Sequence, residues 1–169
     1  IEWIAKEEWC DGNVGMMGSS YEGQTQWYAA SQAPTALKAI VPTASPPGHA
    51  FLNEPFYGGA MILAMAEWMV AMGRRSFQSP GLKGLMTEHH PYFDALPLAK
   101  LGPDAGTCNP WWERDWLNHP SHDEFWESCG YEQFWQKIRV PALNLTGWWD
   151  MNFIGSPRNF SGMSKNGAT

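Results

Sequence analysis

The residues whose types and spacing best suit chemistry are Gly18, Ser20 and Gly23, where an apolar run meets a helix-like run. Residues 14–17 predict a short strand buried on both faces, and residues 21–31 predict a helix. A serine at such a turn exposes its hydroxyl, and the first amides of the helix lack partners nearby. Nucleophilic acyl transfer needs both, because the attacked carbonyl oxygen becomes an oxyanion. A structural Gly/Ser turn is the alternative, and the flanking elements favour the nucleophile.

Asp150 is the second candidate catalytic residue. It follows residues 140–147, which predict a strand, so its carboxylate falls on the rim where open α/β sheets place their active sites. In α/β-hydrolases the chain order is Ser, then Asp or Glu, then His. All five histidines of this chain precede Asp150. We therefore expect the catalytic histidine to lie beyond Thr169; the alternative is that the arrangement is a different one.

The spacing of the predicted elements indicates an α/β fold. Residues 37–42 predict a second strand, and a strand, helix and strand at this spacing imply a right-handed parallel crossover. Beyond residues 45–48 the strand pattern stops for about ninety residues, as expected for an inserted subdomain. It returns at residue 138. We therefore predict a partial α/β-hydrolase core in residues 1–46 and 138–169, interrupted by a helical cap in residues 47–137.

The insert is predicted to be helical and rich in aromatic side chains. Residues 61–72 are nearly all apolar but carry Glu67 and fall short of the roughly 20 residues of a membrane span, so a buried cap helix is expected. Residues 111–116 and 125–135 place aromatic residues at helical spacing. Most of the 11 tryptophans are expected to pack in this lid or in an apolar acyl pocket, with sugar stacking as the alternative.

Composition limits the possible partners of the chain. The 169 residues carry 17 acidic and 11 basic side chains without a basic cluster, which argues against nucleic acid. Three cysteines without a CxxC pair suggest neither a thiolate metal site nor a complete disulfide framework. Residues 1–9 predict a short helix that begins abruptly at Ile1, without an initiator methionine or signal peptide. We therefore expect a fragment of a longer protein whose N- and C-terminal parts are missing.

Several further residues have types that can bind ligands. His119, His122 and Asp123 have metal-ligand types but lack a third spaced ligand, so a lid motif in which Asp123 caps a helix is the preferred interpretation. Residues 89–90, a histidine pair, predict an exposed loop. Trp149 adjoins Asp150, and one of residues 148–149 is expected to face the pocket. No metal or cofactor is predicted.

The motifs of the chain resemble those of the CocE/NonD hydrolases, the superfamily of cocaine esterase, α-amino acid ester hydrolases, glutaryl acylases and X-Pro dipeptidyl-peptidases. The matching stretches are Trp3-Ile4-Ala5-Lys6, residues 9–16, Gly18-Ser19-Ser20-Tyr21-Glu22-Gly23, Gln26-Trp27, His119-Pro120, Asp123-Glu124-Phe125-Trp126, Val140-Pro141-Ala142-Leu143 and Gly147-Trp148-Trp149-Asp150. The resemblance spans nearly the whole chain. It is most specific over residues 1–45 and 110–160.

The resemblance implies an α/β-hydrolase core with a helical cap inserted after the strand that follows the nucleophile helix. It implies that Ser20 is the nucleophile, that Asp150 is the triad acid and that the Tyr21 N–H is one oxyanion donor. In the family, an upstream tyrosine supplies the other donor, the histidine follows the acid by about thirty residues, and a jelly-roll domain comes later. All three are absent from this sequence.

Substrate-binding residues are suggested by the same resemblance. In α-amino acid ester hydrolases, part of a carboxylate cluster for the substrate ammonium follows the triad acid directly, where this chain has Met151-Asn152-Phe153. Glu54 could supply one lid carboxylate, although a lone loop glutamate is more often solvated. Trp149, Asn152 and Glu54 are the candidate substrate-binding residues.

The predicted function is that of a serine hydrolase that cleaves esters or amides through an acyl-enzyme. An X-Pro dipeptidyl-peptidase, with Glu54 or Glu22 as the anchor of a free amino group, is one alternative. A non-catalytic, aromatic-rich binding module on the same scaffold is the other. The expected partner is a small ester, amide or short peptide, with no nucleic acid and no membrane. Oligomeric state and localisation stay open.

Overall fold

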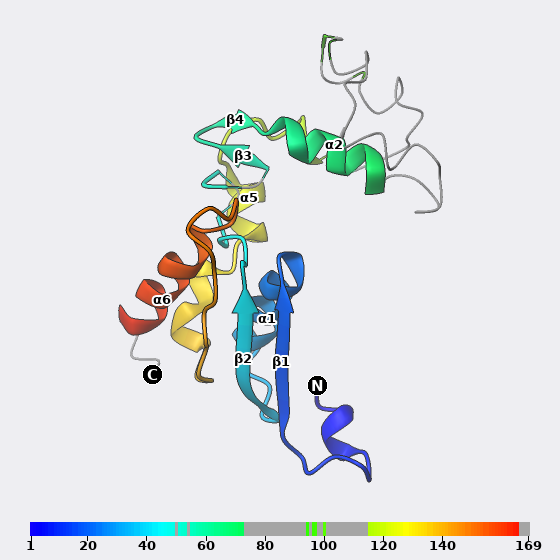
Figure 1. Ribbon diagram of the computed structural model, residues 1–169, viewed down its shortest axis with the longest axis vertical. Helices are drawn as coiled ribbons and strands as arrows, with labels where there is room; N and C mark the ends of the chain where they lie inside the picture. Colours follow the sequence, from blue (N-terminus) through cyan, green and yellow to red (C-terminus); the bar gives the residue numbers. More distant parts are fainter. Residues whose placement is uncertain are drawn as a thin grey trace.

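A strand, a helix and a second strand form the first unit of the computed structural model (Figure 1). They are β1 (Val14–Ser19), α1 (Tyr21–Ser31) and β2 (Leu37–Thr43). The two strands pair in parallel, from Val14 opposite Leu37 to Ser19 opposite Thr43. The predicted strand–helix–strand unit is therefore confirmed. The chain has an α/β structure.

The structure describes residues 1–49, 51–53, 55–72, 94, 96–97, 100 and 115–165. Within these ranges the remaining elements are η1 (Ile4–Lys6), β3 (Phe56–Tyr57), β4 (Ala60–Met61), α2 (Leu63–Met72), α5 (Glu124–Cys129), η5 (Glu132–Lys137) and α6 (Gly155–Lys165). Several residues that the sequence singled out lie outside the described residues, namely Glu54, residues 89–90, Cys108 and residues 111–114. No described helix is both long enough and apolar enough to cross a bilayer.

The segment after residue 140 runs parallel to β2 on the edge opposite β1. Ile40 bridges Ala142, and Thr43 bridges Leu145. The amide of Leu145 donates to the Pro42 carbonyl at 3.1 Å. The predicted strand over residues 140–147 is thus present only as two isolated bridges, and the chain turns away after Gly147. The order across the sheet is β1, β2 and then this segment.

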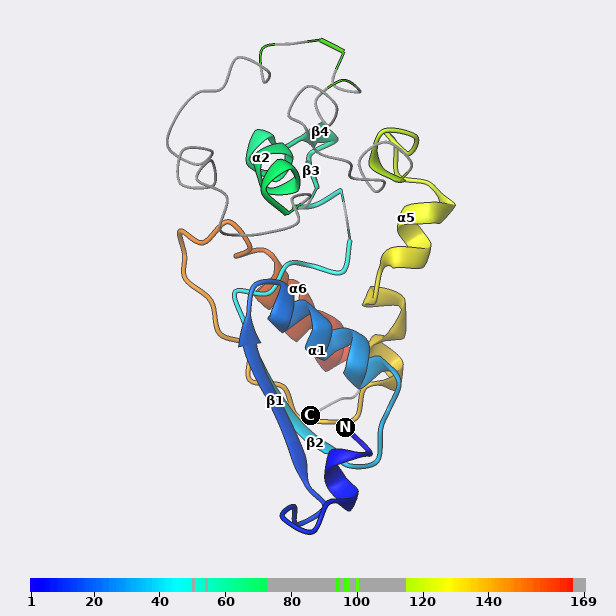
Figure 2. The same ribbon diagram turned by 90° about the vertical axis from the view of Figure 1, so that its right-hand side faces the viewer.

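Helices α1 and α6 lie on the same side of the sheet (Figure 2). The buried core lies between these helices, β2 and η5, with Trp27 stacked on Tyr131 at 5.9 Å between ring centroids. The side chains of β1 alternate, and Met17 is 82% exposed on the face away from the helices. The prediction that β1 is buried on both faces is therefore wrong, because only one face of the strand is covered by the described helices.

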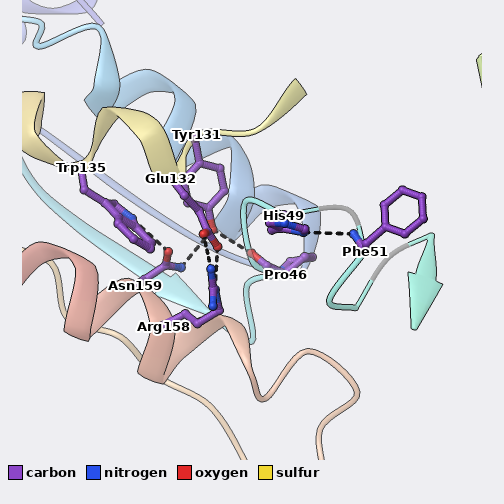
Figure 3. Close-up of polar contacts among 8 residues, drawn as sticks. All are labelled: Pro46, His49, Phe51, Tyr131, Glu132, Trp135, Arg158 and Asn159. Carbon is purple, nitrogen blue, oxygen red and sulfur yellow. Dashed lines mark hydrogen bonds and ion pairs between the residues drawn. The ribbon is translucent and has the colours of Figure 1, made fainter. Parts of the chain in front are cut away.

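Polar contacts tie α6 to η5 and to Tyr131, which directly precedes η5 (Figure 3). The Tyr131 hydroxyl donates to the Pro46 carbonyl at 2.8 Å and accepts from the Asn159 amide at 3.0 Å. The Trp135 indole N–H donates to the Asn159 side-chain oxygen, Oδ1, at 3.3 Å. Arg158 forms two hydrogen bonds to the Glu132 carboxylate, which raises the pKa of the arginine. Tyr131, assigned to the cap by its sequence, is therefore part of the core.

The inserted region differs from its prediction in two places. A short antiparallel hairpin, β3 and β4, precedes α2, although no strand was expected there. The helical pattern of residues 125–135 is split at Gly130, where an added Cβ would lie 2.5 Å from the Gly48 carbonyl oxygen. The helix is therefore interrupted at Gly130, where the chain passes close to Gly48, and α5 and η5 are separate helices. Helix α2 buries Ala66 but leaves Trp68 43% exposed, so it is only partly a buried helix.

The N-terminal segment forms less helix than its sequence predicts. Within residues 1–9 only one 3₁₀ turn forms, at Ile4–Lys6, and no side chain caps it. A helix of nine residues is marginal without such help. Instead, the Glu2 carboxylate accepts the Ala36 N–H at 3.0 Å, and this bond lowers the pKa of Glu2. The segment therefore braces the loop between α1 and β2.

Candidate active site

Ser20 lies at the carboxyl end of β1, in a backbone conformation that side chains rarely adopt. Its φ is 58° and its ψ is −126°, and the residue is exposed. Non-glycine residues in such regions persist only where the surroundings hold them, and they cluster at functional sites. Here the Ser20 amide donates to the Thr43 carbonyl at 3.0 Å, which continues the β1–β2 pairing up to the turn. The strand therefore holds the strained residue in place.

The strained turn leaves the Ser20 hydroxyl available. Ser20 occupies the N-cap position of α1, but its side chain makes no capping hydrogen bond. Its carbonyl accepts from the amides of Gly23 at 2.9 Å and Gln24 at 3.1 Å. The Tyr21 amide has no acceptor among the described residues, as expected for the first residue of a helix. A free hydroxyl and a free N–H therefore adjoin at this corner.

The glycines around Ser20 allow two close approaches. A Cβ on Gly18 would lie 2.7 Å from the Glu22 Cβ, so the bare glycine makes room for the glutamate side chain. A Cβ on Gly23 would lie 2.9 Å from the Ser45 Cβ and 3.2 Å from the Thr43 carbonyl oxygen. Helix α1 can therefore start close against the end of β2. This geometry accounts for a glycine three residues after the serine rather than two.

Gln26 is a supporting residue that the sequence indicated only as part of a matching motif, without a role. It is fully buried and its side-chain amide donates to the carbonyl of Glu22 at 3.0 Å and that of Gly18 at 3.3 Å. Its side-chain oxygen accepts the Val41 N–H at 3.0 Å. One side chain thus joins β1, α1 and β2 behind the turn. Its place in the Gln26-Trp27 motif, just over one turn into the helix, is the sequence signal that could have indicated this role.

Asp150 lies at the same edge of the sheet as Ser20. The segment that leads to it pairs in parallel with β2, and β2 pairs in parallel with β1, so all three carboxyl ends point the same way. Two strand spacings separate the outer segments, which is about 10 Å. Asp150 and Ser20 are therefore neighbours on one rim without a direct contact. No described histidine is hydrogen bonded to Ser20.

An open hollow of about 540 Å³ lies beside Asp150. Its walls are mostly apolar and include Phe51, Tyr57, Trp148 and Phe153. Trp148 stacks on Phe153 with 5.1 Å between ring centroids. Trp149, the tryptophan chosen from the sequence, is fully exposed, and Trp148 is the one that lines the hollow. The site therefore offers an apolar surface next to the candidate acid.

Asn152 is placed differently from what a substrate contact requires. Only 4% of the residue is exposed, and its side-chain oxygen accepts the Asn53 side-chain amide at 2.6 Å. Its backbone N–H donates to Asp150 Oδ1 at 2.7 Å. Asn53 is 2% exposed and was missed by sequence reasoning, because it stands in a loop without any pattern. The side-chain oxygen and the backbone N–H of Asn152 are thus bonded to Asn53 and Asp150 rather than available to a substrate.

The histidines of the lid have structural partners. His119 Nδ1 lies 2.6 Å from Asp123 Oδ2, and this hydrogen bond lowers the pKa of Asp123. Asp123 Oδ1 accepts the N–H groups of Phe125 and Trp126, so the predicted cap of α5 is confirmed. Within the part of the chain that the structure describes, no group of three His, Cys, Asp or Glu residues could hold a metal ion.

A family profile and a curated protein both match nearly the whole chain. A sequence profile described as X-Pro dipeptidyl-peptidase (S15 family) matches residues 1–168. The cocaine esterase of Rhodococcus sp. (strain MB1 Bresler) is 34% identical over 182 residues, which cover 98% of this chain and 31% of that protein. The chain thus spans less than a third of the length of this relative.

Two solved structures share the fold. One is an α-amino acid ester hydrolase, which superposes with a TM-score of 0.72 at 23% identity. The match covers 96% of this chain and 27% of the hydrolase chain. The other, an aminopeptidase from the marine sediment archaeon Thaumarchaeota archaeon, has a TM-score of 0.69 at 24% identity and covers 98% and 28%. The chain thus shares an α/β fold with both structures. The chain belongs to the X-Pro dipeptidyl-peptidase (S15) family.

Proposed function

We propose that this chain is the nucleophile-and-acid portion of a serine hydrolase that cleaves ester or amide bonds by a two-step acyl-enzyme route. The observation that carries the proposal is the Ser20 turn, whose strained backbone leaves the hydroxyl uncapped on the rim that also bears Asp150. Membership of the S15 family supports it. The names of the relatives, an esterase, an ester hydrolase and an aminopeptidase, point to the same bond types.

Each residue has a role in the proposed reaction. Ser20 Oγ attacks the substrate carbonyl while a histidine beyond Thr169 takes its proton. The Tyr21 N–H donates to the oxyanion, and Asp150 orients the histidine and stabilises its charged form. The histidine then gives that proton to the alcohol or amine, whose bond to the carbonyl carbon breaks, and the acyl group stays on Ser20. In the second step the histidine takes a proton from water, the water oxygen attacks the acyl carbon, and the Ser20 oxygen leaves with the proton as the acid is released.

We further propose the finer architecture that this role implies. Residues 1–46 and 138–169 belong to an α/β-hydrolase core, and residues 47–137 form a cap over its rim, except that Tyr131 packs into the core. The apolar hollow beside Asp150 takes the acyl or leaving group. Trp148 supports this assignment because it lines the hollow. Trp149 does not line the hollow and is fully exposed, so it could contact only the part of a ligand that lies outside it. Glu54 stays a candidate lid carboxylate.

Covalent labelling tests the nucleophile directly. A fluorophosphonate probe applied to the full-length protein should form an adduct on the Ser20 peptide, found by mass spectrometry. Ser20→Ala should lose the adduct, and Ser19→Ala is the matched control that should retain it. An unlabelled Ser20 in the folded protein would instead support a non-catalytic, aromatic-rich binding module.

The S15 family description favours a second candidate, an X-Pro dipeptidyl-peptidase. Such an enzyme needs an anion for the substrate's free amino group, and Glu54 or Glu22 would have to supply it. Among the described walls of the hollow, Asp150 is the one charged side chain, which favours a substrate without an ammonium group. Comparing an X-Pro substrate with a free and with a blocked amino group decides, because only a dipeptidyl-peptidase rejects the blocked form.

A further inference from the structure

The loop that carries Asp150 is almost entirely exposed. Trp148 is 81% exposed, Trp149 100% and Met151 55%, and Asp150 is exposed as well. Two turns shape the loop, since the Asp150 amide donates to the Gly147 carbonyl at 3.1 Å and the Phe153 amide donates to the Asp150 carbonyl at 3.0 Å. These bonds are local. They set the shape of the loop but do not fix it to the body of the protein.

One side chain of the loop makes that attachment. Asn152 is buried, and its side-chain oxygen accepts from Asn53 Nδ2 at 2.6 Å, across 99 residues of sequence. Both amides lie in the interior, where a hydrogen bond is stronger than in water and a lost partner is costly. The Asn53–Asn152 bond therefore joins the acid loop to the segment that precedes β3.

The same residue also holds the carboxylate. The Asn152 backbone N–H donates to Asp150 Oδ1 at 2.7 Å, which engages one carboxylate oxygen and restricts the direction of the group. The other oxygen, Oδ2, has no hydrogen-bond partner among the described residues. A triad acid needs one oxygen for the N–H of its histidine, in a fixed direction. The arrangement supplies that oxygen and its orientation together.

We propose that Asn53 and Asn152 act as a pair of positioning residues that fix the direction of the Asp150 carboxylate toward the catalytic histidine. The inference rests on the proposed function, since it takes Asp150 as the triad acid. Asn53 also lines the hollow beside Asp150. The segment that forms the substrate surface thus also sets the geometry of the catalytic acid.

A double-mutant cycle in the full-length protein tests the pair. Asn53→Ala and Asn152→Ala are each expected to lower kcat for a p-nitrophenyl ester about tenfold, with KM changed by less than about twofold. The double variant is expected to fall no further, because either change breaks the same bond. Active sites are counted by the end point of fluorophosphonate labelling, so unfolded molecules do not enter kcat.

The pH profile separates positioning from plain destabilisation. A misdirected carboxylate stabilises the imidazolium less, so the acid limb of kcat should move to lower pH in both single variants. Asn159→Ala is the matched control. It removes another buried asparagine, which bonds to Tyr131 and Trp135 away from Asp150. It is expected to lower the melting temperature while leaving kcat per site and the acid limb unchanged.

The outcomes divide cleanly. If Asp150→Ala is inactive but Asn53→Ala and Asn152→Ala keep kcat and the acid limb, or if their losses add, the positioning role is overturned and the proposed function stands. If Asp150→Ala retains full activity, the proposed function fails. Should Asn53→Ala not fold, Asn53→Ser serves in its place, because its shorter hydroxyl cannot span the distance to Asn152.

Discussion

At the scale of single residues, Ser20 combines backbone strain with an uncapped hydroxyl. A positive φ with ψ near −126° is easy for glycine and unfavourable for a residue with a Cβ. The protein keeps serine at this position although the cap position of α1 gains nothing from its side chain. Local stability is therefore lower than it would be with glycine, as expected where chemistry decides the residue.

Replacing Ser20 by glycine should stabilise the protein. Relief of the strain is worth roughly 1–3 kcal/mol, and the greater freedom of glycine in the unfolded chain takes back up to about 1 kcal/mol. We expect Ser20→Gly to raise the free energy of unfolding in urea by about 1 kcal/mol. Ser20→Ala is the matched control, because it removes the hydroxyl but keeps the Cβ. Equal stability of the two variants would show that the turn is not strained.

The two candidate catalytic residues could be predicted from the sequence, whereas the side chains that position Asp150 could not. Ser20 and Asp150 stand at the ends of apolar runs, and that pattern alone places them on one rim. The role of Asn152 depends on Asn53, which is distant in sequence and lies in a loop without periodicity. A side-chain pair of this kind follows from tertiary packing, which no local pattern encodes.

At the scale of elements, η5 and α6 are joined through the Tyr131 hydroxyl. Tyr131 is fully buried, and burial, the largest cause, raises the pKa of its hydroxyl, so it stays protonated as a donor. The hydroxyl serves the Pro46 carbonyl and the Asn159 amide at once. One oxygen atom thus connects three segments of the chain.

Tyr131→Phe should therefore destabilise the protein by about 1–3 kcal/mol, because it leaves two buried polar partners unsatisfied. Chemical denaturation followed by tryptophan fluorescence measures the loss. Tyr28→Phe is the control, since the Tyr28 hydroxyl donates to the carbonyl of Cys129, an exposed residue that water can reach. A larger loss in Tyr28→Phe than in Tyr131→Phe would contradict the role assigned to the network.

His49 makes a second contact between elements, and this one depends on pH. Its ring stacks on His122 with 4.3 Å between centroids. Its Nδ1 accepts the Phe51 N–H at 3.3 Å, as Figure 3 shows. Burial and the neighbouring His122 lower the pKa of His49, while Glu132 raises it and Arg158 lowers it. The fold therefore favours the neutral ring, which alone can accept the hydrogen bond.

Because the pKa of His49 is lowered in the folded state, its contribution to stability is complete above the unfolded value of about 6.5 and is lost as the pH falls below it. Wild type should lose more free energy of unfolding than His49→Gln between about pH 7.5 and about pH 5. Urea titrations at the two pH values give the comparison. A difference between the proteins that does not change with pH would refute the assignment.

The elements themselves were predicted well where one periodicity governed a segment. Helix α1 and strand β2 appear at the expected places. Residues 125–135 were read as one helical pattern, but contact with Gly48 breaks it at Gly130. Residues 1–9 form only one 3₁₀ turn instead of the predicted helix, and Glu2 bonds to Ala36 in the loop before β2. In both cases a tertiary contact overrode a local preference.

At the scale of the whole molecule, the proposed triad is divided between this chain and residues beyond it. The isolated chain of residues 1–169 should therefore hydrolyse p-nitrophenyl esters only at the background rate, because loss of the base costs several orders of magnitude in kcat. The full-length protein, measured in parallel, should turn over. Hydrolysis by the isolated chain that Ser20→Ala abolishes would place the base within these residues instead.

The architecture could be predicted only as far as sequence order reveals neighbours. The parallel pairing of β1 and β2 follows from the helix that connects them, because parallel neighbours need a crossover connection. The pairing of β2 with the segment before Asp150 was suggested by the return of the strand pattern, but its two isolated bridges and the turn at Gly147 were not.

The distant pairing of β2 also bears on how the protein is made. Ile40 and Ala142 are bridged although about 100 residues separate them. At a synthesis rate of about 5–20 residues per second, the β1–α1–β2 unit leaves the ribosome roughly 5–20 seconds before its third neighbour exists. During that interval the outer edge of β2 is open in the nascent chain. Slow emergence of the cap thus exposes a sheet edge to which chaperones or other nascent chains can bind.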